Sequence, residues 1–211
     1  MTRFIIRVVF LLLPLFFALH GAEKDKAKWD NIYSREGYVY GAAPVAFLKD
    51  KVKLLPKGRA LVLAMGEGRN AVFLAEQGFD VVGVDISEVA VKKALLLAKE
   101  RGVKITPIAA DLEKYSIEEN AYDLITCFNY LQRDLAPQMK KGLKPGGMII
   151  FQTFTIDQLK YKRGPSNKNF LLRRNELLDM FHGMHVVYYS ETDTGKKVVA
   201  SLIAQKKKDG E

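Results

Sequence analysis

The sequence predicts an α/β protein with a doubly wound (Rossmann-like), mostly parallel sheet, helices on both faces and an antiparallel hairpin at its C-terminal edge. Three observations predict this class. Short apolar runs alternate with helical segments along most of the 211 residues. A glycine turn joins the first apolar run to a helix. The last two strand-like runs follow each other without a helix between them.

Each element can be placed from its apolar run and the residues that bound it. Strands are expected at 60–64, 81–84, 104–109, 121–128, 148–154, 184–189 and 196–204. Helices are expected at about 29–33, 46–53, 70–77, 87–101, 137–142 and 174–180, with a long polar loop at 155–169. Ser87 is placed to cap the N-terminus of its helix, and Gly102 stands where a C-cap belongs.

The first 22 residues form a separate element. Arg3 and Arg7 precede an apolar run from Val8 to Leu19, and small residues follow up to Ala22. This order is typical of a secretory signal peptide, since a membrane span needs roughly 20 apolar residues. An uncleaved membrane anchor and a buried helix of the fold are the alternatives. We therefore expect a leader or anchor over 1–22, a charged linker over 23–28, and one domain over 23–211.

Composition excludes several function classes. The net charge of +9 is partly terminal, and no cluster of Lys and Arg interleaved with aromatic residues is apparent, so no nucleic-acid partner is expected. The single cysteine, Cys127, lies in an apolar run, which predicts a buried structural thiol and excludes a disulfide. His20, His182 and His185 are scattered, so no metal site is expected.

The stretch from Arg59 to Ser87 predicts a binding site. Gly66 and Gly68 lie between a strand and a helix, where a ligand can approach the backbone closely. Asp85 ends the next strand, where a carboxylate can accept hydrogen bonds from two ribose hydroxyls. The unit therefore predicts a nucleoside-bearing cofactor.

Two cofactors are candidates. The pattern Gly66-x-Gly68-x-x-Ala71, with Asp85 at about the expected distance, fits the dinucleotide fingerprint of NAD(P)-dependent oxidoreductases. Three features favour S-adenosylmethionine (SAM). Asp111 ends the third strand, in position to read the adenine amino group; the turn at 145–147 precedes a strand that runs into the terminal hairpin; and no Tyr-x-x-x-Lys pair occurs.

Taken together, residues 29 to about 204 resemble the class I SAM-dependent methyltransferases. Within that superfamily the chain is most similar to the tellurite-resistance group and its small-molecule-methylating relatives. The narrower resemblance rests on residues 38–41, 66–70, 130–133, 164–167 and 170–172. It implies an enzyme that transfers a methyl group from SAM to a small acceptor, such as a thiol or a tellurite- or selenite-like oxyanion.

The resemblance also implies which residues bind the cofactor. The methionine end would be bordered by Ala64, Gly66 and Gly68, and Asn70 is also among the cofactor-binding residues. Asp85 would hold the ribose, and Ile86 would pack on adenine, whose edge would contact Asp111 and Leu112. The methyl-transfer side would be lined by Phe128 and Asn129. Many members have an acidic residue near the end of the first strand, which is absent from Leu61–Ala64. The ammonium group would then be held by backbone carbonyls or by Glu67.

Four residues are candidates for the acceptor pocket, namely Tyr38, Tyr40, Tyr130 and Arg133. Trp29 and Tyr33 lie with Tyr38 and Tyr40 in the N-terminal arm, residues 29–50, and these rings either cover a small-molecule site or fasten the arm to the core. Arg133 either binds an anionic acceptor or pairs with an acidic neighbour. No nucleophilic side chain is required, because the cofactor supplies the reactive carbon.

The export-like leader conflicts with a cofactor that is made in the cytosol. We expect either an exported protein, a domain associated with the membrane through residues 1–22, or a cytoplasmic protein whose start codon is assigned too far upstream. A non-catalytic SAM-binding protein is a further alternative. The sequence names neither the acceptor nor the oligomeric state.

Overall fold

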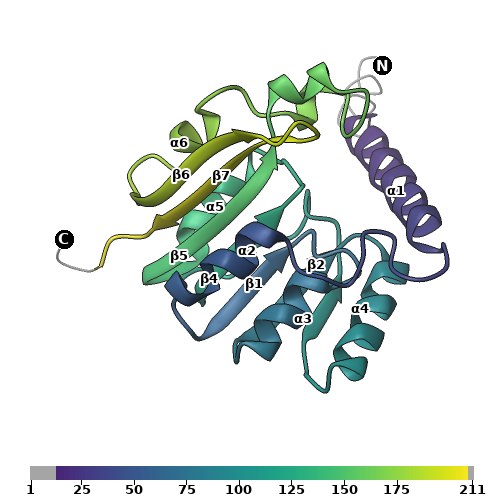
Figure 1. The fold of residues 1–211 in the computed structure, drawn as a ribbon. Helices are drawn as coiled ribbons and strands as arrows, with labels where there is room; N and C mark the ends of the chain where they lie inside the picture. Colours follow the sequence, from purple (N-terminus) through teal and green to yellow (C-terminus); the bar gives the residue numbers. More distant parts are fainter. Residues whose placement is uncertain (1–12, 209–211) are drawn as a thin grey trace, which may run out of the picture.

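The computed structural model describes residues 13–208 and contains one mixed, seven-stranded sheet with helices on both faces (Figure 1). The strand order is β3-β2-β1-β4-β5-β7-β6. The strands are β1 Arg59–Leu63, β2 Asp80–Asp85, β3 Thr106–Ala109, β4 Tyr122–Phe128, β5 Leu143–Phe154, β6 His185–Asp193 and β7 Val198–Gln205. The first five pair in parallel, and β7 is antiparallel to both of its neighbours. The predicted fold class is confirmed.

The helices follow the predicted order with small shifts at their ends. They are α1 Leu13–Tyr33, α2 Ala46–Lys51, α3 Arg69–Glu76, α4 Glu88–Glu100, α5 Leu135–Gly142 and α6 Glu176–Met180, with 3₁₀ turns η1 Val52–Leu54, η2 Ile156–Lys160 and η3 Lys168–Phe170. The predicted cap of α4 is confirmed, since Ser87 Oγ accepts a hydrogen bond from the Ala90 N–H at 3.1 Å. Gly102 follows α4 with a φ of +67°, as a C-terminal glycine should.

The N-terminal helix departs from the prediction. Residues 23–28, expected to be a linker, belong to α1. Lys26 Nζ lies 2.8 Å from Asp30 Oδ2 one turn further on and 3.4 Å from Glu88 Oε1 of α4. The linker prediction was wrong because these charges sit at the four-residue spacing that suits a helix surface. Residues 1–12 of the predicted leader lie outside the described residues, and its boundary after residue 22 stays a prediction.

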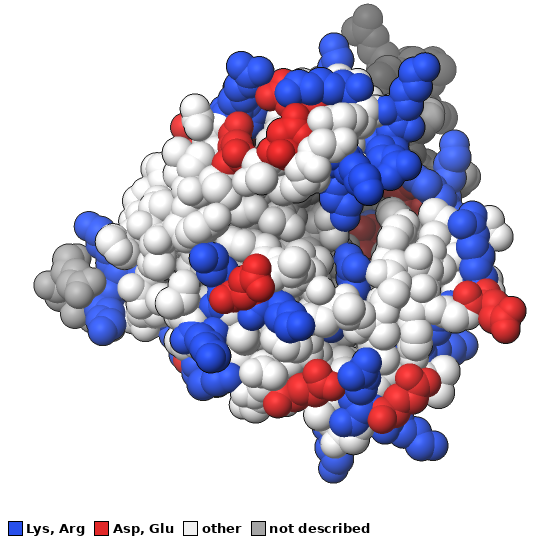
Figure 2. All heavy atoms as spheres, in the orientation of Figure 1, with Lys and Arg blue, Asp and Glu red and all other residues white. Residues whose placement is uncertain are grey.

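The edge of the sheet where the parallel strands end is the place where ligands bind in open α/β sheets. The turns after β1, β2, β3 and β4 all meet there. Figure 2 shows a hollow on this face with acidic atoms in its depth and Lys and Arg side chains above it. Among residues 13–208, no helix combines the length and apolar character that crossing a membrane would need.

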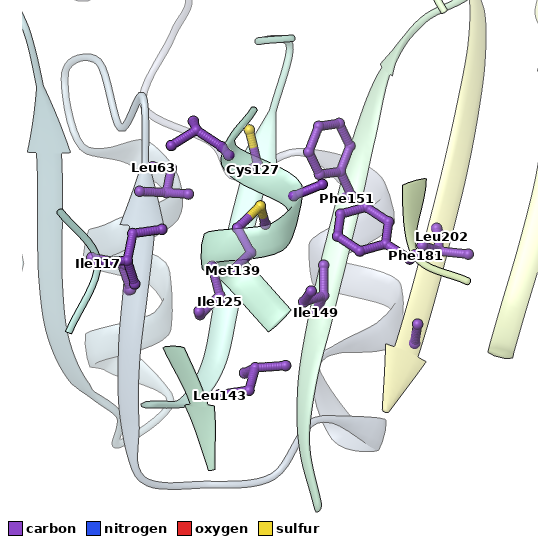
Figure 3. Close-up of a cluster of buried hydrophobic side chains, with 14 of the residues drawn as sticks. Leu63, Ile117, Ile125, Cys127, Met139, Leu143, Ile149, Phe151, Phe181 and Leu202 are labelled. Atoms are coloured by element: carbon purple, nitrogen blue, oxygen red, sulfur yellow. The ribbon is translucent and has the colours of Figure 1, made fainter. Parts of the chain in front are cut away.

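Two apolar layers fix that edge. On one face of the sheet, Met139 of α5 and Phe181 after α6 pack on the strands, with the Phe151 and Phe181 ring centroids 5.8 Å apart (Figure 3). Cys127 belongs to this layer, and its burial raises the pKa of the thiol, so the predicted structural role is confirmed. On the other face, α2, α3 and α4 cover the sheet through residues such as Leu48 and Leu74.

Candidate cofactor and acceptor site

The turn after β1 places three residues in the left-handed backbone region, with φ values of +49° at Ala64, +57° at Gly66 and +87° at Gly68. Glycine adopts this conformation freely, whereas an L-residue such as alanine loses about 1–2 kcal/mol there. Ala64 therefore carries backbone strain at the end of β1, and strain of this kind concentrates at functional sites.

Asp85 joins this turn to the start of α4. Its Oδ2 accepts a hydrogen bond from the Gly66 N–H at 2.7 Å, and its Oδ1 accepts one from the Ser87 N–H at 2.9 Å. The side chain is buried, and burial raises the pKa of the carboxyl above its ordinary value, against the effect of the two N–H donors. The nearby Asp30 carboxylate raises that pKa further. The predicted ribose ligand thus lies at the glycine turn, at the end of β2.

The raised pKa predicts a pH dependence of SAM binding. Ribose hydroxyls donate to the ionised carboxylate, so binding favours the deprotonated form and releases a proton wherever free Asp85 is protonated. We expect the association constant to rise with pH until the raised pKa of Asp85 is passed and then to level off. Calorimetry with S-adenosylhomocysteine between pH 5 and pH 8 measures this. An association constant that falls with rising pH over that range would contradict the expectation.

Helix α1 closes over the same turn and carries Trp29 and Tyr33, two of the aromatic residues expected either to cover the site or to fasten the arm. A Cβ atom on Gly66 would lie 3.0 Å from the Tyr33 hydroxyl oxygen. The Tyr33 ring stacks on Trp29 at 5.6 Å and meets Tyr40 edge-on at 6.2 Å. Asp30, on the same helix, accepts a hydrogen bond from Ser87 Oγ at 2.6 Å. The available signal was the spacing of Trp29, Asp30 and Tyr33, which places them on one face of a helix.

Glu67 is committed to contacts within the protein. Its Oε1 lies 3.0 Å from Lys93 Nζ, and its Oε2 accepts from the Tyr40 N–H at 3.4 Å. Lys93 also donates to the carbonyls of Arg35 and Gly37, at 2.7 and 2.6 Å. Glu67 therefore fastens the arm to α4, and these contacts do not support it as the ligand of the SAM ammonium group. Backbone carbonyls stay the prediction for that group.

Asp111, the residue predicted to read the adenine amino group, has a buried oxygen without a partner among the described residues. Asp111 Oδ1 accepts from the Glu113 N–H at 2.9 Å, whereas Oδ2 is buried and accepts no hydrogen bond from any described residue. Lys114 Nζ lies 3.9 Å from that oxygen, beyond hydrogen-bond distance. Buried polar atoms are almost always paired, so an unpaired carboxylate oxygen here fits an incoming amino group. Ile86, which follows Asp85, is partly exposed, and Leu112, which follows Asp111, is buried.

The residues predicted to line the methyl-transfer side lie at the end of β4 and directly after it. Phe128 is buried, and Asn129 is exposed with a φ of +57° and donates its N–H to the Gln152 carbonyl at 2.9 Å. Tyr130 is half-buried and donates from its hydroxyl to Gln132 Oε1 at 2.8 Å. Burial raises the pKa of the Tyr130 phenol, so this group stays protonated at neutral pH.

Two predicted site residues have other partners. Tyr38 packs against a small buried cluster between α3 and α4 that includes Val72 and Leu97, and its hydroxyl donates to Glu100 Oε2 at 3.3 Å. It therefore fastens the arm, as one of the two alternatives held, and these contacts give no support to its assignment to the acceptor pocket. Asn70 is buried, and its Oδ1 accepts from the Val45 N–H at 2.9 Å, which anchors the start of α2. This contact leaves the cofactor role of Asn70 without support.

Arg133 pairs with a buried acidic neighbour. Its Nε and Nη2 donate to the two oxygens of Glu176 at 2.6 and 3.1 Å, in a bidentate pair. Its Nη1 and Nη2 also donate to the carbonyls of Asn169 and Leu171, at 2.9 and 3.0 Å. The guanidinium therefore clamps the loop before α6 onto the segment after β4. Binding an anionic acceptor, the other alternative, has no support from these contacts.

Replacing Arg133 by glutamine tests this clamp. Breaking a buried ion pair costs about 3–5 kcal/mol of unfolding free energy. Because Arg133 is half-exposed, solvent screens the pair, and the expected cost falls to about 2 kcal/mol. We expect a loss of unfolding free energy of this size with no change in the order of acceptor preference, measured by urea denaturation and by methylation assays. A variant of unaltered stability that loses only its anionic acceptors would restore the binding role.

The topology separates the two cofactor alternatives. Dinucleotide-binding sheets have the strand order 3-2-1-4-5-6, whereas here β7 is inserted antiparallel between β5 and β6. Among the residues described, no group of His, Cys, Asp and Glu side chains is arranged to hold a metal ion.

Comparisons with known proteins agree with the fold. The family described as "Methyltransferase domain" matches residues 60–147. A ubiquinone biosynthesis O-methyltransferase of Bordetella avium (strain 197N) is 33% identical over 72% of this chain and 68% of its own length. Among solved structures, TehB from Haemophilus influenzae superposes with a TM-score of 0.67 at 22% identity, covering 85% of this chain and 67% of that one. A structure described as "Conversion of a Disulfide Bond into a Thioacetal Group during Echinomycin Biosynthesis" gives a TM-score of 0.68 at 20% identity, covering 88% and 93%.

The chain belongs to the class I SAM-dependent methyltransferases. Its cofactor is therefore SAM, and it is a transferase acting on a small-molecule acceptor.

Proposed function

We propose that the acceptor is a small molecule whose nucleophilic atom is soft or already anionic at neutral pH, a thiol or a tellurite- or selenite-like oxyanion. The observation that carries this proposal is the chemistry of the segment after β4. Phe128, Asn129 and Tyr130 bring no group that takes up a proton near pH 7. Of the two histidines with described side chains, His185 begins β6 beside Gln205, at the opposite edge of the sheet, and exposed His182 contacts the Asp179 carbonyl.

The proposed roles follow from this arrangement. SAM supplies a methyl group on a sulfonium centre, which a nucleophile displaces in line. Asp85 would hold the ribose, Asp111 would receive the adenine amino group, and Tyr33 and Tyr40 would keep water from the methionine end. Holding acceptor and methyl group at near-attack distance is worth about 7–11 kcal/mol without a catalytic base.

A phenolic acceptor is the second candidate. The similarity to the Bordetella avium ubiquinone biosynthesis O-methyltransferase favours it. A phenol with a pKa near 10 is mostly protonated at pH 7, so O-methylation would need a base that Phe128, Asn129 and Tyr130 do not offer. A catechol or another acidic phenol would reduce that need.

An acceptor panel with methyl-labelled SAM tests the proposal. We expect label in thiol or chalcogen oxyanion products and a rate that follows the ionised fraction of the thiol as pH rises. Transfer to phenols alone would favour the second candidate. SAM binding without any labelled product would support a non-catalytic SAM-binding protein.

For localisation we propose a domain retained at the cytosolic face of a membrane, because this face has access to SAM. N-terminal sequencing of the mature protein with cell fractionation tests it. A chain cleaved near residue 22 and recovered outside the cytosol would contradict it.

A further inference from the structure

Basic side chains gather on a surface that the cofactor site does not use. It consists of residues 156–174, which follow β5, and the β6–β7 turn at 193–197; we call it the basic surface. The two segments carry eight Lys and Arg against two Asp, a net charge of +6. All eight are exposed, namely Lys160, Lys162, Arg163, Lys168, Arg173, Arg174, Lys196 and Lys197. No cluster of Lys and Arg with aromatic residues was expected, yet one forms here, because the fold joins two segments that are distant in sequence.

Buried contacts build this surface into the fold. Gln158 is buried; its Oε1 accepts from the Val198 N–H and its Nε2 donates to the Arg163 carbonyl, both at 2.8 Å. The Tyr161 hydroxyl donates to Asp193 Oδ1, also at 2.8 Å. Residues 156–174 and the β6–β7 turn are therefore held together by these hydrogen bonds.

Most of the charge on the surface is unneutralised. Three of its basic residues have acidic partners within 4 Å: Lys160 with Asp193, Arg173 with Glu176, and Arg174 with Asp157. The other five form no ion pair with any residue that the structure describes. Five free cations on one exposed surface attract an anionic partner.

Apolar side chains stand among these charges. Leu159 is 42% exposed and Phe170 is 53% exposed, beside Lys160 and near Lys168 respectively. Surfaces that insert into the headgroup region of anionic bilayers combine exposed leucine and phenylalanine side chains with surrounding Lys and Arg residues. A nucleic acid would use the cations but would leave Leu159 without a partner.

The position of the surface agrees with a membrane partner. Figure 1 shows the N-terminal end of α1 at the same upper end of the molecule as the segment after β5. The sequence that precedes α1 is apolar from Val8 to Leu12. In addition, the Arg133 clamp on Asn169 and Leu171 attaches the basic surface to the segment after β4.

We propose that the basic surface docks on an anionic lipid bilayer, with Leu159 and Phe170 inserted among the headgroups and the Lys and Arg side chains on the phosphates. Docking turns the segment after β4 toward the bilayer, so acceptors that partition into the interface reach it directly. The docking does not depend on which acceptor is methylated.

A label at position 170 tests docking in the full chain. Cys127 is only 1% exposed, so a Phe170→Cys variant takes an environment-sensitive fluorophore at one site. We expect a blue shift with vesicles of phosphatidylglycerol and phosphatidylcholine, none with phosphatidylcholine alone, and reversal in 1 M salt, where the Debye length is about 3 Å. Quenching by brominated lipid should accompany the shift. A label at Val187→Cys, on the exposed edge strand β6, should not respond.

Matched charge variants distinguish an effect of the basic surface on membrane binding from an effect of the net charge of the protein. Lys162→Glu, Arg163→Glu and Lys168→Glu together should weaken partitioning at least roughly 100-fold, at about fivefold for each basic residue near the membrane. Lys49→Glu, Lys53→Glu and Lys99→Glu make the same change of net charge elsewhere and should weaken it less than about fivefold. The N-terminal segment is present in every variant, so any membrane affinity of its own is the same in both triple variants. An absent shift at 170, an equal shift on zwitterionic vesicles, equal losses in both triple variants, or a response to duplex DNA in place of vesicles would overturn the proposal.

Discussion

Replacing Asp85 by alanine is expected to weaken the binding of SAM and S-adenosylhomocysteine at least about 100-fold. The Asp85 carboxylate stands at the end of β2 beside the Gly66 N–H, where two ribose hydroxyls would donate to it. Hydrogen bonds to a charged group are worth about 1.5–3 kcal/mol each, so losing two removes about 3 kcal/mol or more. Isothermal titration calorimetry measures the change directly.

Asp80 provides the matched control, because it begins the same strand and is exposed. Asp80→Ala should leave the cofactor affinity unchanged. The Asp85 variant also loses acceptors for the Gly66 and Ser87 N–H groups, so its folding must be checked by circular dichroism and urea unfolding. A folded Asp85→Ala protein that binds S-adenosylhomocysteine as tightly as the unaltered chain would exclude Asp85 as the ribose ligand.

The sheet and the position of Asp85 could be predicted because both depend on local patterns. Apolar runs bounded by glycine and a capping serine fix where strands and helices begin and end. In a parallel sheet the residues that end neighbouring strands share one edge, so Asp85 and Asp111 could be expected there before any contact was known. The antiparallel terminal hairpin followed from two consecutive strand-like runs.

Contacts between distant segments could not be predicted in this way. Glu67 was a candidate ligand of the SAM ammonium group, yet it forms an ion pair with Lys93 on the next helix. Arg133 pairs with Glu176, 43 residues further along the chain. The basic surface likewise needs segments from two parts of the sequence. Nothing in the local pattern around any of these residues indicates its partner.

Gly68 shows the same limit, because its position in the glycine turn predicts a contact with the cofactor and the structure also places it against a helix. A Cβ atom at Gly68 would lie 2.6 Å from the Ala94 Cβ and 2.9 Å from the Ala94 Cα on α4. The α4 backbone cannot yield as a flexible side chain would. Gly68 therefore allows α4 to approach the start of α3, independently of any ligand.

We expect Gly68→Ala to lower the free energy of unfolding by about 3 kcal/mol, measured by urea denaturation without cofactor. Overpacking contributes about 1–3 kcal/mol, and the left-handed backbone adds about 1–2 kcal/mol for an L-residue. Gly78→Ala isolates the backbone contribution, since Gly78 has a φ of +85° and a Cβ there would meet nothing within 4 Å. It should cost only about 1 kcal/mol. Adding Ala94→Gly to Gly68→Ala removes the Cβ clash and should recover part of the loss. Equal losses in the two single variants would mean that the tight turn alone requires Gly68.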